Sequence, residues 1–89
     1  MDITFDPVKG AANVAKHGVS LALAKDLDWE TLCAKPDTRQ VYGEARLIGY
    51  ALMGTRLFCV VFTDRGADRR IISLRKANAR EVYRYVANN

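Results

Sequence analysis

The sequence predicts a single α+β domain over residues 1–89, with helices packed on one face of an antiparallel sheet. Two observations indicate this class. Apolar residues alternate with a period of two between residues 46 and 75, which is typical of neighbouring antiparallel strands. Helical patterns that begin with capping residues flank this stretch at residues 6–27 and 78–86. The chain is 49% hydrophobic, which suits one small core with little reserve.

The N-terminal segment predicts a short strand at residues 3–5 followed by two short helices. Asp6 has the character of an N-cap, and Pro7 suits the first helical position. Gly18 is a natural stop for the first helix, and Ser20 caps a second helix that runs to Leu27. Both helices are short and rich in alanine, so we expect them to need a sheet to pack on.

Residues 30–44 are the least regular part of the sequence. Pro36-Asp37 predicts a turn. Two segments are candidates for a short edge strand, residues 31–33 and residues 39–42. The pattern does not choose between them.

The period-two stretch predicts a three-stranded meander. Gly54-Thr55 is a two-residue hairpin signal between strands 46–53 and 56–63. This turn predicts the pairs Leu52–Leu57, Tyr50–Cys59, Ile48–Val61 and Arg46–Thr63. A loop over residues 64–68 leads to a third strand at 69–75. That loop predicts the pairs Thr63–Arg69, Val61–Ile71, Cys59–Ser73 and Leu57–Arg75.

This register predicts that the sheet has one apolar face and one open basic face, because directly opposed residues share a face. The apolar face, which we expect to meet the helices, comprises Leu47, Gly49, Ala51, Phe58, Val60, Phe62, Ile72 and Leu74, with Arg70 at its end. The open face mixes apolar and cationic groups and comprises Arg46, Ile48, Tyr50, Leu52, Cys59, Val61, Thr63, Arg69, Ile71, Ser73 and Arg75.

A C-terminal helix completes the predicted domain. Asn78 and Glu81 have the spacing of a capping box. Ala79, Val82, Tyr83 and Val86 fall on one stripe, which we expect to be buried.

Charge is distributed unevenly along the chain. The net charge is +4, with five Lys/Arg against seven Asp/Glu in residues 1–45 and nine against three in residues 46–89. Such a basic half, with arginine in excess over lysine, favours an acidic partner and phosphate contacts. No apolar run is long enough to span a membrane, and the acidic N-terminus is unlike a signal peptide, so we expect a cytoplasmic protein. Cys33 and Cys59 have no metal-ligand spacing, and we expect no metal and no cofactor.

Five motifs, in this order, resemble the BrnT toxins of bacterial type II toxin–antitoxin systems. They are Asp6-Pro7, Asn13-x-x-Lys16-His17-Gly18-Val19-Ser20, Tyr42-Gly43-Glu44-x-Arg46, Val60-Val61-Phe62-Thr63-Asp64-Arg65 and Arg70-Ile71-Ile72-Ser73-x-Arg75-Lys76-Ala77-Asn78. One departure is Leu21-Ala22-Leu23-Ala24, where these toxins usually carry Phe-Glu-Glu-Ala. We expect this change to have a small effect on stability.

The resemblance implies a fold, an activity and a partner. It implies a single RelE-like toxin domain and a ribonuclease that inhibits translation. It also implies neutralisation by a BrnA-like antitoxin, in a complex of two toxins with two antitoxins. Operator DNA would be bound only through the antitoxin.

RNA cleavage without a metal needs a base, an acid and cations that stabilise the phosphate in the transition state. Arg65 and Arg75, which lie within the shared motifs, are the candidate catalytic cations. Glu44 is a candidate base, with an ion pair as the alternative role. His17 is a candidate acid or base, because its pKa is ordinarily near neutrality, or else it stabilises a helix end.

Four further residues are predicted to contact RNA: Arg46, Arg69, Tyr50 and Lys76. Arginines and lysines hold phosphates, and a tyrosine can stack on a splayed base. The alternative function is a non-catalytic module with the same fold that only binds RNA or its antitoxin.

Overall fold

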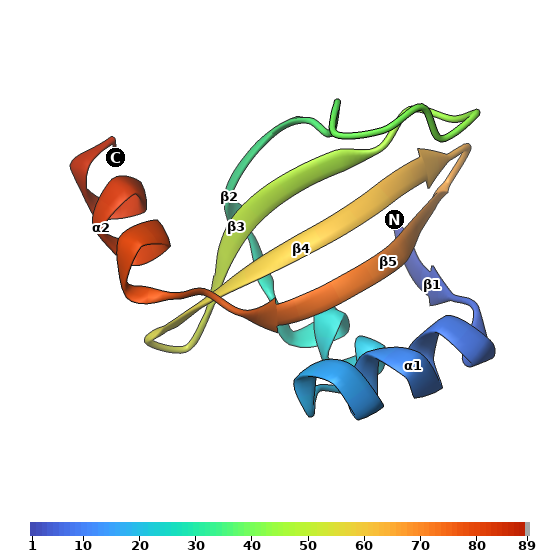
Figure 1. The fold of residues 1–89 in the computed structure, drawn as a ribbon, viewed down its shortest axis with the longest axis horizontal. Helices are drawn as coiled ribbons and strands as arrows, with labels where there is room; N and C mark the ends of the chain where they lie inside the picture. The colour runs from blue at the N-terminus through green and yellow to red at the C-terminus, as the bar shows by residue number, and fades with distance from the viewer. Residues whose placement is uncertain (89) are drawn as a thin grey trace.

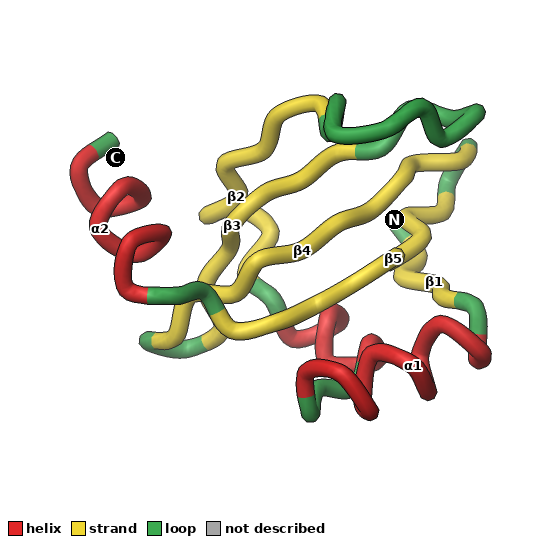
Figure 2. Tube along the Cα trace, in the orientation of Figure 1, coloured by secondary structure: helices red, strands yellow, loops and turns green. Residues whose placement is uncertain are grey.

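The computed structural model describes residues 1–88 and has one five-stranded sheet, with strand order β1-β5-β4-β3-β2 (Figures 1 and 2). In chain order the elements are β1 (Asp2–Phe5), α1 (Pro7–His17), the 3-10 helix η1 (Leu21–Asp26), β2 (Asp28–Pro36), β3 (Leu47–Met53), β4 (Arg56–Arg65), β5 (Asp68–Lys76) and α2 (Ala79–Ala87). The predicted α+β class is confirmed. No helix within residues 1–88 is both long enough and apolar enough to cross a membrane.

The sheet is larger than predicted and is not purely antiparallel. β1 joins it parallel to β5, with Asp2 opposite Asp68 and Phe5 opposite Ile71. Such a pairing between distant segments leaves no local pattern in the sequence. β2 adds a full edge strand to β3, so the expectation of a lone N-terminal strand beside a three-stranded meander was wrong.

β2 contains the candidate strand 31–33, whereas the alternative segment 39–42 lies in the loop before β3. The register of β2 shifts between Asp28 and Cys33, and this irregularity breaks the alternation that would have predicted the strand. The strand also approaches β3 closely. A Cβ on Gly49 would lie 2.8 Å from the Ala34 Cβ, so only glycine fits there.

The predicted β3–β4 hairpin is confirmed. Leu52 opposes Leu57, Tyr50 opposes Cys59 and Ile48 opposes Val61, as the Gly54-Thr55 turn predicts. The fourth predicted pair is absent because β3 begins at Leu47, after Arg46. Thr63 instead donates a hydrogen bond to the carbonyl oxygen of Ala45 at 2.6 Å, which anchors the loop before β3.

The predicted β4–β5 register was wrong. Arg65 pairs with Asp68, so the turn is shorter than the predicted five-residue loop. Cys59 opposes Arg75, and Val61 opposes Ser73. The register then shifts between Val61 and Phe62, as expected of a β-bulge in which one strand carries an extra residue.

The bulge exchanges the faces of the first half of β5. Ile71 pairs with Phe62, and it is completely buried in the core instead of lying on the opposite face. Ile72, predicted to be a core residue, lines a groove on the other side. For the same reason Arg69 lies on the core side of the sheet and Arg70 on the opposite side, the reverse of the prediction. Arg70 was therefore wrongly assigned to the helix side.

The core forms against one face of the sheet, which we call the core face. Buried side chains on this face come from Ala51, Phe58, Val60, Phe62, Ile71 and Leu74. They pack against Val19, Leu21, Ala24 and Leu27, around and within η1. The predicted second helix is therefore present as the 3-10 helix η1. Its buried residues, Leu21 and Ala24, pack against the core. Trp29 adds an edge-to-face contact with Phe62, with 5.5 Å between ring centroids.

α1 forms over the residues that the sequence predicts. It lies beside β5 (Figure 1). Asp6 caps it by accepting a hydrogen bond from the Val8 amide, and Gly18 ends it with a φ of 69°. The buried Asn13 side chain binds the β5 backbone. Its Nδ2 donates to the carbonyl oxygens of Leu74 and Val19 at 2.8 and 2.9 Å, and its Oδ1 accepts from the Leu74 amide at 3.2 Å.

α2 has the predicted capping box between Asn78 and Glu81, but its apolar stripe is not buried. Val82, Tyr83 and Val86 are 39%, 76% and 67% exposed. The helix meets the sheet through its opposite, polar side. There the Tyr85 hydroxyl donates to the Thr31 carbonyl oxygen at 2.6 Å. The period of the sequence correctly indicated which residues of α2 form the apolar stripe. It does not tell whether that stripe or the other side of the helix packs against the sheet.

We predict that Asn13→Ala destabilises the fold by about 2–4 kcal/mol, because it leaves the buried carbonyl and amide of Leu74 and the carbonyl of Val19 without this partner. Urea unfolding at neutral pH measures this change. Asn88→Ala is the matched control, because Asn88 is exposed beyond α2 and its amide bonds only locally to the Arg84 carbonyl. A loss of stability no greater than that of the control would contradict the role of Asn13.

Candidate functional site

A basic groove of about 370 Å³ lies on the sheet face opposite the core, which we call the groove face. Its floor includes Val61, Ile72 and Ser73. Its rim carries the side chains of Lys9, Lys16, His17, Arg39 and Arg75. Among the groove-lining residues that the structure describes there is no carboxylate. This face was expected to be open, but along β4 its residues Cys59, Val61 and Thr63 are buried.

The groove brings together two of the predicted catalytic residues. His17 lies in the last turn of α1, where a cation also favours the helix dipole, and it is half-buried. Arg75 reaches the groove from the C-terminal end of β5. The structure therefore places an imidazole and a guanidinium on one concave surface, although they are 58 positions apart in the sequence.

Arg75 is held in place by α2. Its Nη1 and Nη2 bind the two carboxylate oxygens of Glu81 at 2.7 and 2.9 Å. Tyr50 donates its hydroxyl to the same carboxylate at 2.7 Å. The hydrogen bond from Arg75, with smaller contributions from Asn78 and Tyr50, lowers the pKa of Glu81 to about 2.

The same hydrogen bonds determine how the Tyr50 hydroxyl can act. Burial, and then its hydrogen bond to Glu81, raises the pKa of Tyr50 above its usual range. The hydroxyl therefore remains protonated and acts as a donor. Tyr50, predicted to contact RNA, is directed by this bond toward α2, and it does not line the basic groove.

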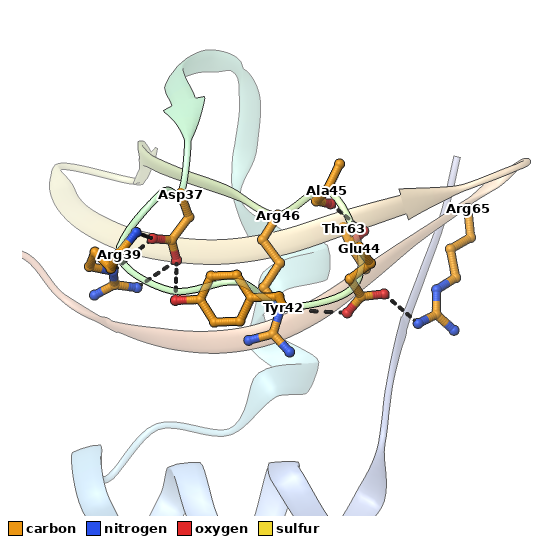
Figure 3. A network of polar contacts seen from close by, with 8 residues as sticks. All are labelled: Asp37, Arg39, Tyr42, Glu44, Ala45, Arg46, Thr63 and Arg65. Atoms are coloured by element: carbon orange, nitrogen blue, oxygen red, sulfur yellow. Dashed lines mark hydrogen bonds and ion pairs between the residues drawn. The ribbon is translucent and has the colours of Figure 1, made fainter.

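A second cationic cluster lies around Glu44 (Figure 3). Arg65 Nη2 binds Glu44 Oε2 at 2.6 Å, and Arg46 Nε lies 3.5 Å from Glu44 Oε1. The Arg46 guanidinium also stacks on the Tyr42 ring, 4.1 Å from its centroid. The hydrogen bond from Arg65, opposed in part by desolvation, lowers the pKa of Glu44. Glu44 thus has the ion-pair geometry that was the alternative to its role as a base.

The loop between β2 and β3 carries a further cation, Arg39, which was not among the predicted site residues. Arg39 binds the buried carboxylate of Asp37 at 2.7 and 2.8 Å, and Tyr42 donates to it at 3.2 Å (Figure 3). Hydrogen bonds from Arg39 hold the pKa of Asp37 well below its usual range. This clip positions Arg39 over the groove. The only local signal was an acidic residue directly after Pro36 and two positions before an arginine.

Two predicted RNA contacts lie away from the groove. Arg69 is on the core face, where its guanidinium lies over the rings of Trp29 and Phe62 and binds Asp64 at 2.8 and 3.0 Å. The β-bulge accounts for this placement. Lys76 is exposed opposite Phe58, on the other side of β5 from Arg75.

Known proteins resemble this chain over most of its length. A family model described as "Ribonuclease toxin, BrnT, of type II toxin-antitoxin system" matches residues 5–81. The crystal structure of the Brucella abortus ribonuclease toxin BrnT matches with a TM-score of 0.63 and 31% sequence identity, over 88% of this chain and 97% of that chain. No curated protein matches.

We predict that Glu81→Gln changes the pH dependence of stability. Because the folded pKa of about 2 lies below the usual 4.5, ionised Glu81 stabilises the fold above pH 4.5, and this contribution is lost as pH falls from 4.5 to 2. The difference in unfolding free energy between wild type and E81Q should therefore shrink over that interval. Urea unfolding at several pH values measures it.

Arg75→Gln supplies the control for this experiment. In the R75Q background the guanidinium that lowers the pKa of Glu81 is gone, so E81Q should change the pH profile much less. Parallel profiles for wild type and E81Q would contradict the assignment.

Proposed function

The chain belongs to the BrnT family of type II ribonuclease toxins, and from this premise we propose that it cleaves RNA in the basic groove without a metal and thereby inhibits translation. The observation that carries the proposal is that His17 and Arg75 line one groove whose described lining holds five basic side chains and no carboxylate. A polyanionic strand is attracted to such a surface, and its phosphates find both a proton-transfer group and a cation there.

The proposed reaction is a transesterification in which RNA supplies its own nucleophile. The ribose 2′-oxygen forms a bond to phosphorus, the bond from phosphorus to the 5′-oxygen breaks, and a 2′,3′-cyclic phosphate results. One proton leaves the 2′-hydroxyl and one is delivered to the departing 5′-oxygen. We assign one of these transfers to His17, because an imidazole exchanges protons readily near neutral pH.

Arg75 is the proposed stabiliser of the phosphate in the transition state. Its hydrogen bonds to Glu81 raise its own pKa, so the side chain remains a cation. Glu81 orients the guanidinium and uses only part of its N–H donors, and the side chain is 34% exposed. Phosphate can therefore bind the remaining donors at a guanidinium that is already positioned.

The Glu44 cluster has a proposed supporting role. Arg65 is exposed, and Arg46 is half-buried beside it at the end of the loop between β2 and β3. We propose that these arginines hold the RNA backbone outside the groove, and that Glu44 positions them. Arg39, Lys9 and Lys16 add positive charge along the groove itself.

A type II toxin has an antitoxin partner. We propose that the antitoxin is BrnA-like, that the complex contains two copies of each protein, and that operator DNA is bound through the antitoxin. The net charge of +4 suits an acidic toxin-binding segment. An RNA substrate places the proposed activity in the cytoplasm.

We predict that His17→Ala and Arg75→Ala each lower the rate of RNA cleavage by roughly 10²–10⁴-fold, because each removes a group that acts in the transition state. Arg65→Ala should have a smaller effect. Cleavage in EDTA, with detection of 2′,3′-cyclic phosphate ends, measures the rate. Arg56→Ala, in an exposed arginine beside the β3–β4 turn, is the matched control.

Growth arrest on induction in bacteria provides the cellular readout, and thermal unfolding verifies that each variant is folded. Salt-sensitive RNA binding without cleavage by wild type would indicate the non-catalytic module instead. Folded H17A and R75A proteins that cleave as fast as R56A would overturn the proposed site.

A further inference from the structure

The outward side of α2 is an apolar surface with no partner within the described chain. It consists of Val82, Tyr83 and Val86, which we call the α2 stripe, and none of the nine residues of α2 is buried. These residues recur at the spacing of one helix face. In a domain of 88 described residues, such a regular stripe on a helix that is already attached by its other side indicates a protein-binding surface.

The attachment of α2 leaves this stripe free while keeping the helix in place. Glu81 binds Arg75 and Tyr50, and Tyr85 binds the backbone of Thr31, all from the side opposite the stripe. In Figure 1, α2 projects beyond one end of the sheet. A partner can therefore cover Val82, Tyr83 and Val86 without displacing the contacts that hold the helix.

The charges beside the stripe indicate the chemistry of the partner. Arg80 is exposed one helical turn before Tyr83 and flanks the stripe, whereas the exposed Arg84 lines the pocket between α2 and the β2–β3 edge together with Glu81 and Tyr85. The only acidic side chain of α2 is Glu81, which is 10% exposed and committed to Arg75. The accessible surface of α2 is therefore apolar and positively charged, and it complements an acidic amphipathic segment.

The same charges argue against a second copy of this chain. Two α2 helices packed antiparallel through their stripes would place Arg80 of each copy at the edge of an interface made of two basic helices. The only carboxylate of each helix, Glu81, is already occupied by Arg75 and cannot compensate. Cations brought together at an interface without a carboxylate partner oppose self-association.

We infer that the α2 stripe is a docking surface for an acidic amphipathic helix of the antitoxin. This inference rests on the proposed function for the existence of that partner. The opposite side of α2 holds Arg75 through Glu81, so a partner on the stripe lies about one helix diameter, ~10 Å, from the groove cation. Docking there places the partner beside the proposed active groove.

The test is binding of the antitoxin to the full-length chain carrying Val82→Gln and Val86→Gln. The probe is a purified BrnA-like antitoxin, with affinity measured by calorimetry or interferometry. We expect the double variant to bind roughly 100-fold more weakly, because it removes the apolar contacts of the centre of the interface. Its RNA cleavage should remain unchanged, since neither valine lines the groove.

Val8→Gln with Val14→Gln is the matched control, because these valines are 77% and 49% exposed on α1. It should bind the antitoxin as wild type does. Arg80→Glu should also weaken binding, and the wild-type affinity should fall with added salt, whereas an uncharged interface would show neither effect.

Each contrary result has a distinct meaning. Equal affinity of wild type and V82Q/V86Q overturns the docking surface and leaves the ribonuclease proposal standing. Self-association of wild type that V82Q/V86Q abolishes, with antitoxin affinity unchanged, assigns the stripe to a second copy and also overturns it. A wild-type chain that neither cleaves RNA nor binds the antitoxin overturns the proposed function and this inference together.

Discussion

The hydrogen bonds of the Asn13 side chain are the constraint on which the arrangement of this protein depends. β1 pairs with β5 only as far as Ile71, so the remaining edge of β5 would otherwise be unpaired. The Asn13 amide provides both an acceptor and a donor for the backbone of Leu74, and it also binds the Val19 carbonyl group. One side chain thus completes the sheet edge, orients α1 and fixes the turn that follows it. His17 faces the groove because α1 is held in this orientation.

The β-bulge in β5 is a second constraint, because it determines which face of the sheet each arginine of β5 occupies. Without it, Arg69 and Arg75 would share a face. With it, Arg69 covers the rim of the core, where Trp29 and Phe62 stack against its guanidinium. Arg75 alone among the arginines of β5 reaches the groove. The bulge therefore gives one arginine a structural environment and leaves another available for an anionic ligand.

Carboxylates hold the important arginines in place at both ends of the groove face. Asp37 orients Arg39, Glu81 orients Arg75, and Glu44 lies between Arg65 and Arg46. Such pairs add little stability where they are exposed, but they restrict rotamers and reduce the entropy lost when a phosphate binds. Lys9 and Lys16 have no carboxylate beside them in the groove lining that the structure describes, so they supply its net positive charge. The arginines with carboxylate partners are therefore held in fixed positions, whereas the lysines without such partners provide the charge that attracts an anion.

Features that depend on neighbouring residues could be predicted from the sequence alone. Asp6 and Gly18 bound α1, Gly54-Thr55 sets the β3–β4 register, and Asn78 and Glu81 form the capping box, because caps and tight turns are local geometry. The shared motifs likewise identified the family. Four other features could not be predicted in this way: the parallel β1–β5 pair, the bulge that exchanges Arg69 and Arg70, the Asp37 ion pair that positions Arg39, and the outward stripe of α2. These features depend on contacts between distant segments, and the period of a sequence describes the faces of an element without telling which face meets another.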